Sequence, residues 1–119
     1  MKPSRQLVIE KIRLYWPDSV DAVVSELDEI RRDDTTDEGL ARVQLAVIKL
    51  SEGVRQKLAD NIRAAIQDYR DVLAYAEFPK EMAAVHLFHF NMSADEQIHA
   101  KAILKSDREQ YEAWLTGNE

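Results

Sequence analysis

The chain has 119 residues, of which 45% are hydrophobic and 32% are charged. This length fits a single domain over residues 1–119, and this composition excludes a largely disordered chain. The chain contains no cysteine, which excludes disulfides, thiolate zinc sites and cysteine nucleophiles.

The start of the chain has no apolar signal-peptide core, because Lys2, Arg5 and Glu10 interrupt its first ten residues. The longest stretch without a charged side chain, residues 82–94, is too short to cross a bilayer as a helix. We therefore expect a cytoplasmic protein that makes no contact with a membrane.

The net charge of −6 is concentrated between Asp18 and Glu38, where nine acidic residues face only two arginines. A negative protein repels phosphate backbones, and nucleic-acid binding normally needs a clustered basic face. A few basic residues gather near the N-terminus, but they are typical of a solvated helix face. We expect no nucleic-acid partner. These basic residues are Lys2, Arg5, Lys11 and Arg13.

Two helices are predicted in the first third of the chain. Ser4 is a plausible N-cap for a first helix that runs to about Trp16, and Pro17 breaks it. Asp18 then caps a second helix, because apolar residues follow it at helical spacing. These residues are Val20, Val23, Val24, Leu27 and Ile30.

A third helix follows the loop-like segment 33–39, with Thr36 as its cap. Apolar residues surround much of its circumference, which predicts burial on several sides. Gly53 is expected to close this helix with left-handed backbone. Because the next helix follows at once, we expect the two to pair as tight antiparallel neighbours.

The stretch from Val54 to Pro79 predicts the longest helix, and we expect it to be the central element of the fold. Its apolar residues recur at steps of three and four, and Pro79 ends the helix by restricting Phe78. The predicted buried stripe comprises Val54, Leu58, Ile62, Ala65, Ile66, Tyr69, Leu73 and Ala76.

The last third of the chain predicts one short and one long helix. A helix over residues 81–90 is preferred to a strand, because no other segment offers a pairing partner. Ser93 and Glu96 form a capping box that starts the last helix, which Gly117 ends. Ser106 and Glu109 repeat that pattern, which leaves open whether the last helix is broken there. The chain is therefore predicted to be all-α, a single-domain bundle or orthogonal array of five to six helices.

A candidate polar cluster lies in the long helix. Asp68 and Asp71 are neighbours on a helical surface, and they invite a reading as a general base or a ligand pair. Ordinary surface charge is the preferred interpretation, because no His, Ser or Lys nearby completes a catalytic arrangement. We therefore assign no catalytic residue. The cluster comprises Asp68, Arg70, Asp71 and Glu77.

The same segment carries a resemblance. The run DYRDVLAYAEFP, with LAVIKLSEG before it and DREQYEAWL near the C-terminus, resembles a family of small uncharacterised bacterial helical proteins with a DYRDVL-x-x-AE-(Y/F)-P motif. The resemblance covers residues 45–115 approximately. It implies no activity and no functional residue, and only marks positions that merit mutation: Asp68, Tyr69, Arg70, Asp71, Glu77 and Pro79.

His86 and His89 lie three residues apart, a spacing that can place two imidazoles on one helical face for a metal. Glu81 or Glu96 could add a carboxylate. The established zinc-protease and paired di-iron patterns are absent, however, and both histidines lie among apolar residues. We therefore expect no metal and no other cofactor.

Residues 78–92 form an uncharged, aromatic segment apart from Lys80 and Glu81, and core packing is its default interpretation. If only partly covered, the segment would be an association surface rich in aromatic residues and methionine. Its candidate contact residues are Phe78, Met82, His86, Phe88, His89 and Phe90.

Two functions follow from this sequence. We favour a non-enzymatic module that binds a protein partner, or a second copy of itself, through the aromatic segment or the acidic surface around Asp18–Glu38. The alternative is a small metal-binding protein or enzyme that uses His86, His89 and nearby carboxylates. The first is favoured because the chain shows no catalytic motif.

Overall fold

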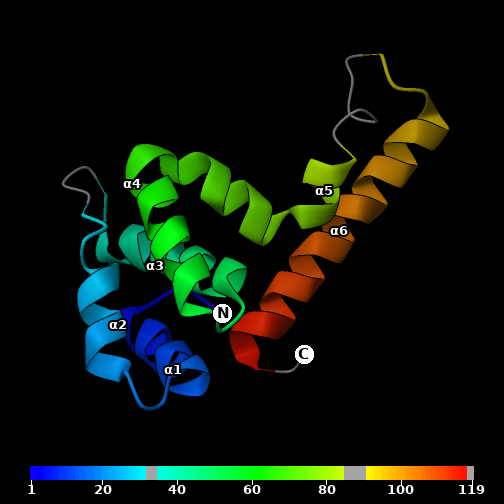
Figure 1. Cartoon of the computed structure of the whole chain (residues 1–119). Coiled ribbons are helices and arrows are strands. Elements are labelled where there is room, and N and C mark those ends of the chain that lie inside the picture. Colours follow the sequence, from blue (N-terminus) through cyan, green and yellow to red (C-terminus); the bar gives the residue numbers. More distant parts are fainter. Residues whose placement is uncertain (32–34, 85–90, 118–119) are drawn as a thin grey trace. The chain divides into compact units, whose positions relative to one another are not determined.

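A computed structural model describes residues 1–31, 35–84 and 91–117. Within these ranges the chain forms six helices and no strand, which confirms the predicted all-α class (Figure 1). No helix in the same ranges is both long and apolar enough to span a membrane. The helices are α1 (Arg5–Tyr15), α2 (Val20–Leu27), α3 (Asp37–Ser51), α4 (Arg55–Glu77), α5 (Pro79–Ala83) and α6 (Ala94–Thr116).

The chain forms two compact units. The N-terminal unit, Lys2–Ala76, contains α1, α2, α3 and nearly all of α4. The C-terminal unit contains α5 and α6 and comprises Glu77–Glu119 with Met1. That residues 1–119 form a single domain stays a prediction.

The central helix of the N-terminal unit is α3. Its apolar side chains are buried around most of its circumference, as predicted, and α1 packs closely against it and against α2. The expectation that α4 is the central helix is wrong, because Val54 just before it and Ile66 within it are 45% and 57% exposed. The fully buried side chains of α3 include Gln44, Leu45, Val47 and Ile48.

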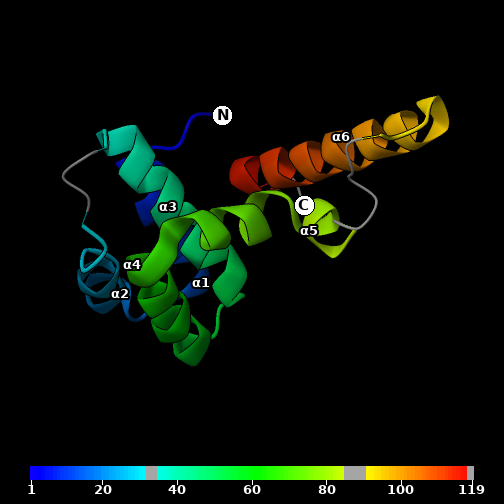
Figure 2. The same ribbon diagram turned by 90° about the horizontal axis from the view of Figure 1, so that it is seen from above.

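α4 is not one straight helix. Asp68 has extended backbone (φ −156°, ψ 99°), which divides α4 into two legs that run in different directions (Figures 1 and 2). Asn61 of the first leg donates to Ser51 Oγ at 3.2 Å, and Lys49 Nζ donates to the carbonyl of Ala76 in the second leg at 2.9 Å. Both legs therefore lie near the C-terminal end of α3, and the predicted tight antiparallel pairing of α3 with α4 is wrong.

Most predicted helix ends are confirmed. Ser4, Thr36 and Ser93 each accept a hydrogen bond from a backbone N–H of the first turn, and Ser93 forms a full capping box with Glu96. Gly117 has the left-handed backbone that ends α6. These side chains satisfy backbone donors that have no partner within the helix.

Two helix ends differ from the prediction. The N-cap of α2 is Ser19 instead of Asp18, because the N–H of Ser19 donates to the carbonyl of Trp16 at 3.0 Å and places Asp18 inside a turn. After α3, Gly53 is left-handed as predicted, but Glu52 before it is also left-handed, with φ 51°.

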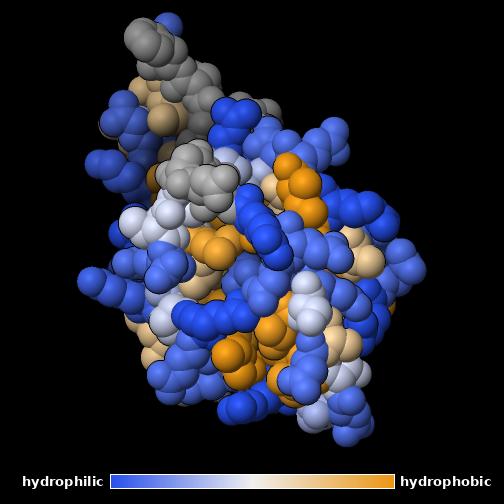
Figure 3. Space-filling model, turned by 90° about the vertical axis from the view of Figure 1, so that its left-hand side faces the viewer, coloured by the Kyte–Doolittle hydropathy of each residue, from blue (hydrophilic) through white to orange (hydrophobic). Residues whose placement is uncertain are grey.

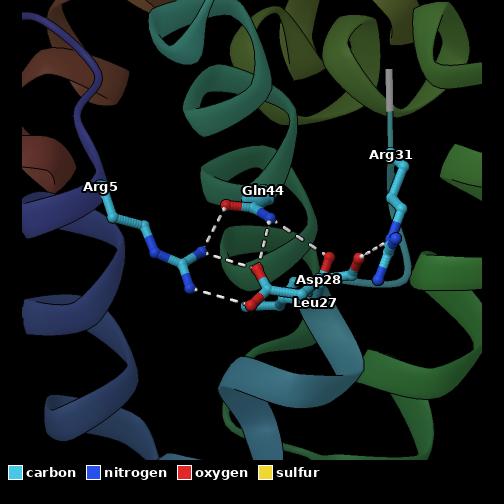
Figure 4. A network of polar contacts seen from close by, with 5 residues as sticks. All are labelled: Arg5, Leu27, Asp28, Arg31 and Gln44. Atoms are coloured by element: carbon cyan, nitrogen blue, oxygen red, sulfur yellow. Dashed lines mark hydrogen bonds and ion pairs between the residues drawn. The ribbon is translucent and has the colours of Figure 1, made fainter. Parts of the chain in front are cut away.

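A polar network joins the first three helices (Figure 4). Gln44 of α3, only 1% exposed, donates to the carbonyl of Leu27 at 3.2 Å and accepts from Arg5 of α1 at 3.4 Å. Arg5 in turn binds both carboxylate oxygens of Asp28, at 2.8 and 3.0 Å. Gln44 thus adds a second donor, beside the N–H of Ile30, to the carbonyl at the end of α2 from inside the core.

The C-terminal unit depends on a cap that comes from a distant part of the sequence. Asp107 of α6, with no exposed surface, accepts from the backbone N–H groups of Lys80 and Glu81 at 3.0 and 2.9 Å. Phe78 stands at the N-cap position of α5 and makes no side-chain cap hydrogen bond. Asp107 therefore caps the first turn of α5 across the unit.

α6 runs from Ala94 to Thr116 without a break, which answers the question that the Ser106–Glu109 pattern left open. The start of α5 differs from the prediction. α5 begins at Pro79 instead of Glu81, because the fixed φ of proline suits the first helical position. The rest of the helix predicted over residues 81–90 lies largely outside the described residues.

Replacing Gln44 with alanine should lower the free energy of unfolding by roughly 1 kcal/mol, because the Leu27 carbonyl loses one of its two donors and keeps only the N–H of Ile30. Urea unfolding followed by circular dichroism measures this loss. Gln6→Ala is the matched control, since Gln6 is exposed and, among the residues that the structure describes, bonds only to Glu10 of its own helix. A change in Gln44→Ala no larger than in Gln6→Ala would contradict the assignment.

Replacing Asp107 with alanine should expose the N–H groups of Lys80 and Glu81 to faster hydrogen exchange, because both lose their acceptor. We expect a cost of roughly 1–3 kcal/mol to the stability of the C-terminal unit. Ser106→Ala, which removes only an exposed contact to the Lys80 ammonium, should leave both amides protected. Equal exchange in the two variants would show that Asp107 is not the cap.

Candidate functional site

Two neighbouring hollows lie between α2 and α4 in the N-terminal unit, and Glu29 lines both. Their volumes are about 400 and about 540 Å³. Residues 26 and 29–31 form one wall, and residues of α4 between 55 and 70 form the other. We call this continuous depression the α2–α4 groove.

An apolar strip lies along the groove. Ile30 and Ile62 are 2% and 3% exposed, so they belong to the core, whereas Ile66 is 57% exposed. Ile62 and Ile66 are four residues apart on one helical face, so the strip runs from the core out to solvent. Seen from the side of α2, apolar surface lies in separate areas among hydrophilic side chains (Figure 3).

The exposure of Ile66 follows from the bend in α4. A straight helix would continue the buried stripe from Ile66 to Tyr69 and Leu73, as the sequence predicts. The extended backbone at Asp68 changes the rotation of the second leg, which buries Val72 in place of Tyr69 and Leu73, and buries Ala76 as predicted. Ile66 therefore lies near the end of the first leg, where it lines the first hollow of the groove.

The groove carries both signs of charge. Arg55 of α4 forms an ion pair across it with Glu26 of α2, and Arg63 pairs with Asp60 on its own helix. Within the part of the chain that the structure describes, no cation pairs with Glu29. Four arginines and three carboxylates line the groove, so its net charge is +1 in a chain of net charge −6.

Asp68 and Arg70 lie at one end of the groove. The carboxylate of Asp68 accepts from the backbone N–H of Arg70 at 3.1 Å, which caps the second leg of α4. It also accepts from two guanidinium nitrogens of Arg70, at 3.0 and 3.1 Å. The guanidinium hydrogen bonds, followed by the backbone hydrogen bond, lower the pKa of Asp68, and the same carboxylate raises the pKa of Arg70.

The structure therefore brings together two of the four residues in the predicted polar cluster. Asp71 is exposed beyond the cap, and Glu77 lies half-buried at the far end of α4. The Asp68–Arg70 pair explains the start of the DYRD run as a helix cap. Chemically it offers a carboxylate already paired with a cation, which is a poor general base.

The predicted aromatic segment is described only in part. Phe78 and Met82 are half-buried at α5, and the other four candidates, residues 86 and 88–90, lie outside the described residues. Among the residues that are described, no group of three His, Cys, Asp or Glu side chains is placed to hold a metal ion. The metal-site alternative, which uses His86 and His89, stays a prediction.

The basic residues near the N-terminus do not form a single exposed basic surface. Arg5 is held by Asp28 of α2, Lys11 is only 5% exposed, and Arg13 is exposed. The expectation of no nucleic-acid partner stays a prediction.

No family model, no curated protein and no solved structure matches this chain. The resemblance to small bacterial helical proteins with the DYRDVL motif therefore also stays a prediction. The functional argument rests on the geometry of the groove.

Sequence reasoning missed the groove residues on α4, because it assigned Ile66 to a buried stripe and did not consider Arg55 and Arg63. A signal for the bend was present. Asp68 followed by Asp71 is an N-cap residue with an acidic residue in the first turn, a pattern typical of a helix start. Its position inside a long apolar repeat concealed it.

The titration of Asp68 should depend on Arg70. Because the pKa of Asp68 is lowered from 3.8, its contacts stabilise the fold at higher pH and are lost as the pH falls through the lowered value. In Arg70→Gln the pKa of Asp68 should rise toward 3.8, which carboxyl carbon NMR measures directly. Arg63→Gln is the matched control, since Arg63 pairs with Asp60 and should leave Asp68 unchanged. An Asp68 pKa that does not change in Arg70→Gln would refute the pairing of Asp68 with Arg70.

Proposed function

We propose that this protein is a non-enzymatic interaction module that binds another protein surface through the α2–α4 groove. One wall of the groove belongs to the acidic surface around Asp18–Glu38 that the sequence singled out. The observation that carries the proposal is Ile66, a large apolar side chain that is 57% exposed between charged walls. Protein interfaces commonly have this arrangement of an apolar centre and a polar rim.

The chemistry of the lining supports binding over catalysis. Its titratable side chains are carboxylates, arginines and one tyrosine, Tyr69, and the Arg55–Glu26 and Arg70–Asp68 pairs neutralise two of the three carboxylates. The described lining holds no His, Ser, Lys or Cys, the side chains that most often act as nucleophile or as a base near neutral pH. Arginine is also common at protein interfaces, where its planar group stacks and forms paired hydrogen bonds.

A photo-reactive phenylalanine analogue in place of Ile66 should form covalent adducts on illumination, because a partner seated in the groove would lie within reach. Leu14 is the matched control position. It is 65% exposed on α1 of the same unit, and it does not line the groove. The adducts are measured by mass spectrometry, first with the purified protein alone and then in an extract of the cells that make it.

We expect adducts at position 66 that are at least about tenfold more abundant than at position 14, and their loss on adding an excess of unlabelled protein. Adducts that form equally at both positions would overturn the proposal, because they would reflect exposure and not a docking site.

A further inference from the structure

We infer that the occupant of the α2–α4 groove is the same groove of a second copy of this chain, so that the protein forms a weak symmetric dimer. The inference rests on the proposed function and names its partner. It follows from the distribution of charge between the two walls.

The two walls of the groove have opposite charge. Glu26 and Glu29 outweigh Arg31 on the α2 wall, which has a net charge of −1. Arg55, Arg63 and Arg70 outweigh Asp68 on the α4 wall, which has a net charge of +2. In a two-fold dimer whose axis runs along the groove, the α2 wall of each copy faces the α4 wall of the other. Each acidic wall then meets a basic wall, twice per dimer, which is electrostatic self-complementarity.

The register of the walls specifies the contact. The Arg55–Glu26 ion pair places the start of α4 level with Glu26. Further along, Glu29 and Arg63 line the second hollow from opposite walls, and Ile30 and Ile66 line the first hollow. Glu29 of one copy therefore faces Arg63 of the other. Glu29 has no cation partner among the described residues of its own chain, so a partner's arginine would supply one.

The charge of the rest of the chain makes this the favoured face for self-association. The groove lining has a net charge of +1, whereas the remainder of the chain must carry −7. Two copies repel one another over most other approaches and least at the groove. Docking there also removes Ile66 of both copies from water, which stabilises the contact.

The size of the face predicts a weak dimer. The first leg of α4 is roughly 20 Å long and two helices side by side are about 20 Å wide, so each copy would bury roughly 400 Å². The total of about 800 Å² is below the ~1,200 Å² of stable complexes. We therefore expect a dissociation constant of order 100 µM, within reach of sedimentation equilibrium.

Sedimentation equilibrium from about 10 µM to about 1 mM tests the dimer, and two charge reversals test its geometry. Glu29→Arg places two arginines opposite each other in the dimer, and Arg63→Glu places two glutamates opposite each other. Each variant alone should dimerise at least about tenfold more weakly than the wild type. An equimolar mixture of the two should recover dimerisation to within about threefold, because each mixed contact again joins opposite charges.

Matched controls separate contact from net charge. Asp21→Arg makes the same charge change as Glu29→Arg at an exposed site on α2 outside the groove, and Arg13→Glu does so for Arg63→Glu on α1. Neither control should weaken dimerisation by the expected factor. Circular dichroism establishes that all variants remain folded, which their exposed positions favour.

A wild type that stays monomeric to about 1 mM would overturn the inference, and so would single variants that dimerise as the wild type does. Weakening in both variants without recovery in the mixture would also overturn it, because the two residues would then not face each other. These failures differ from failure of the proposed function. Adducts at position 66 with another protein, in a chain that stays monomeric, would keep the groove as a docking site and exclude only the second copy as its occupant.

Discussion

One backbone conformation, the extended residue Asp68 inside α4, decides the shape of the N-terminal unit and of its candidate site. Its carboxylate accepts a hydrogen bond from the backbone N–H of Arg70, so the second leg of α4 begins with its own N-cap. The cap replaces a backbone carbonyl of the first leg as the acceptor for this N–H. That leg turns back until the carbonyl of Ala76 reaches Lys49 at the end of α3. The first leg ends with Ile66 exposed beside α2. A local capping preference thus produces both the packing around α3 and the open groove.

In both units a buried polar side chain forms hydrogen bonds to the backbone at one end of a short helix. Gln44 satisfies the carbonyl of Leu27 at the end of α2, and Asp107 satisfies two N–H groups at the start of α5. Each is fully or almost fully buried. Loss of Asp107 would remove this acceptor from two N–H groups, whereas loss of Gln44 would leave the Leu27 carbonyl with the N–H of Ile30 as its remaining donor. The short helices α2 and α5 have little packing surface of their own, and these polar contacts specify where they end and begin.

The groove differs from these buried contacts because its charged side chains are exposed to solvent. At Gln44 and Asp107, polar atoms are buried and paired within the chain. In the groove, Arg63 and Glu29 remain exposed, on opposite walls, around an apolar side chain. Surface ion pairs add little stability to a fold, so this arrangement is more effective in selecting a partner than in holding α2 to α4. The weak, charge-selective contact that we propose fits a groove of this size and polarity.

Local patterns in the sequence were enough to predict the helical class, the caps at Ser4, Thr36 and Ser93, and the burial of α3 on several sides, because each depends on residues within a few positions of one another. The role of Asp107 could not be predicted from a local pattern, since its partners are 26 and 27 residues away. Asp107 also lies within the Ser106–Glu109 pattern, which is typical of a helix start. The bend at Asp68 had a local signal, but helical periodicity on both sides masked it. The groove depends on that bend and on α2 lying beside the first leg of α4. Sequence periodicity determined which residues could be buried. Only the tertiary structure decided that Val54 and Ile66 of the predicted stripe stayed exposed to water, because burial requires a neighbour that the chain brings from far away.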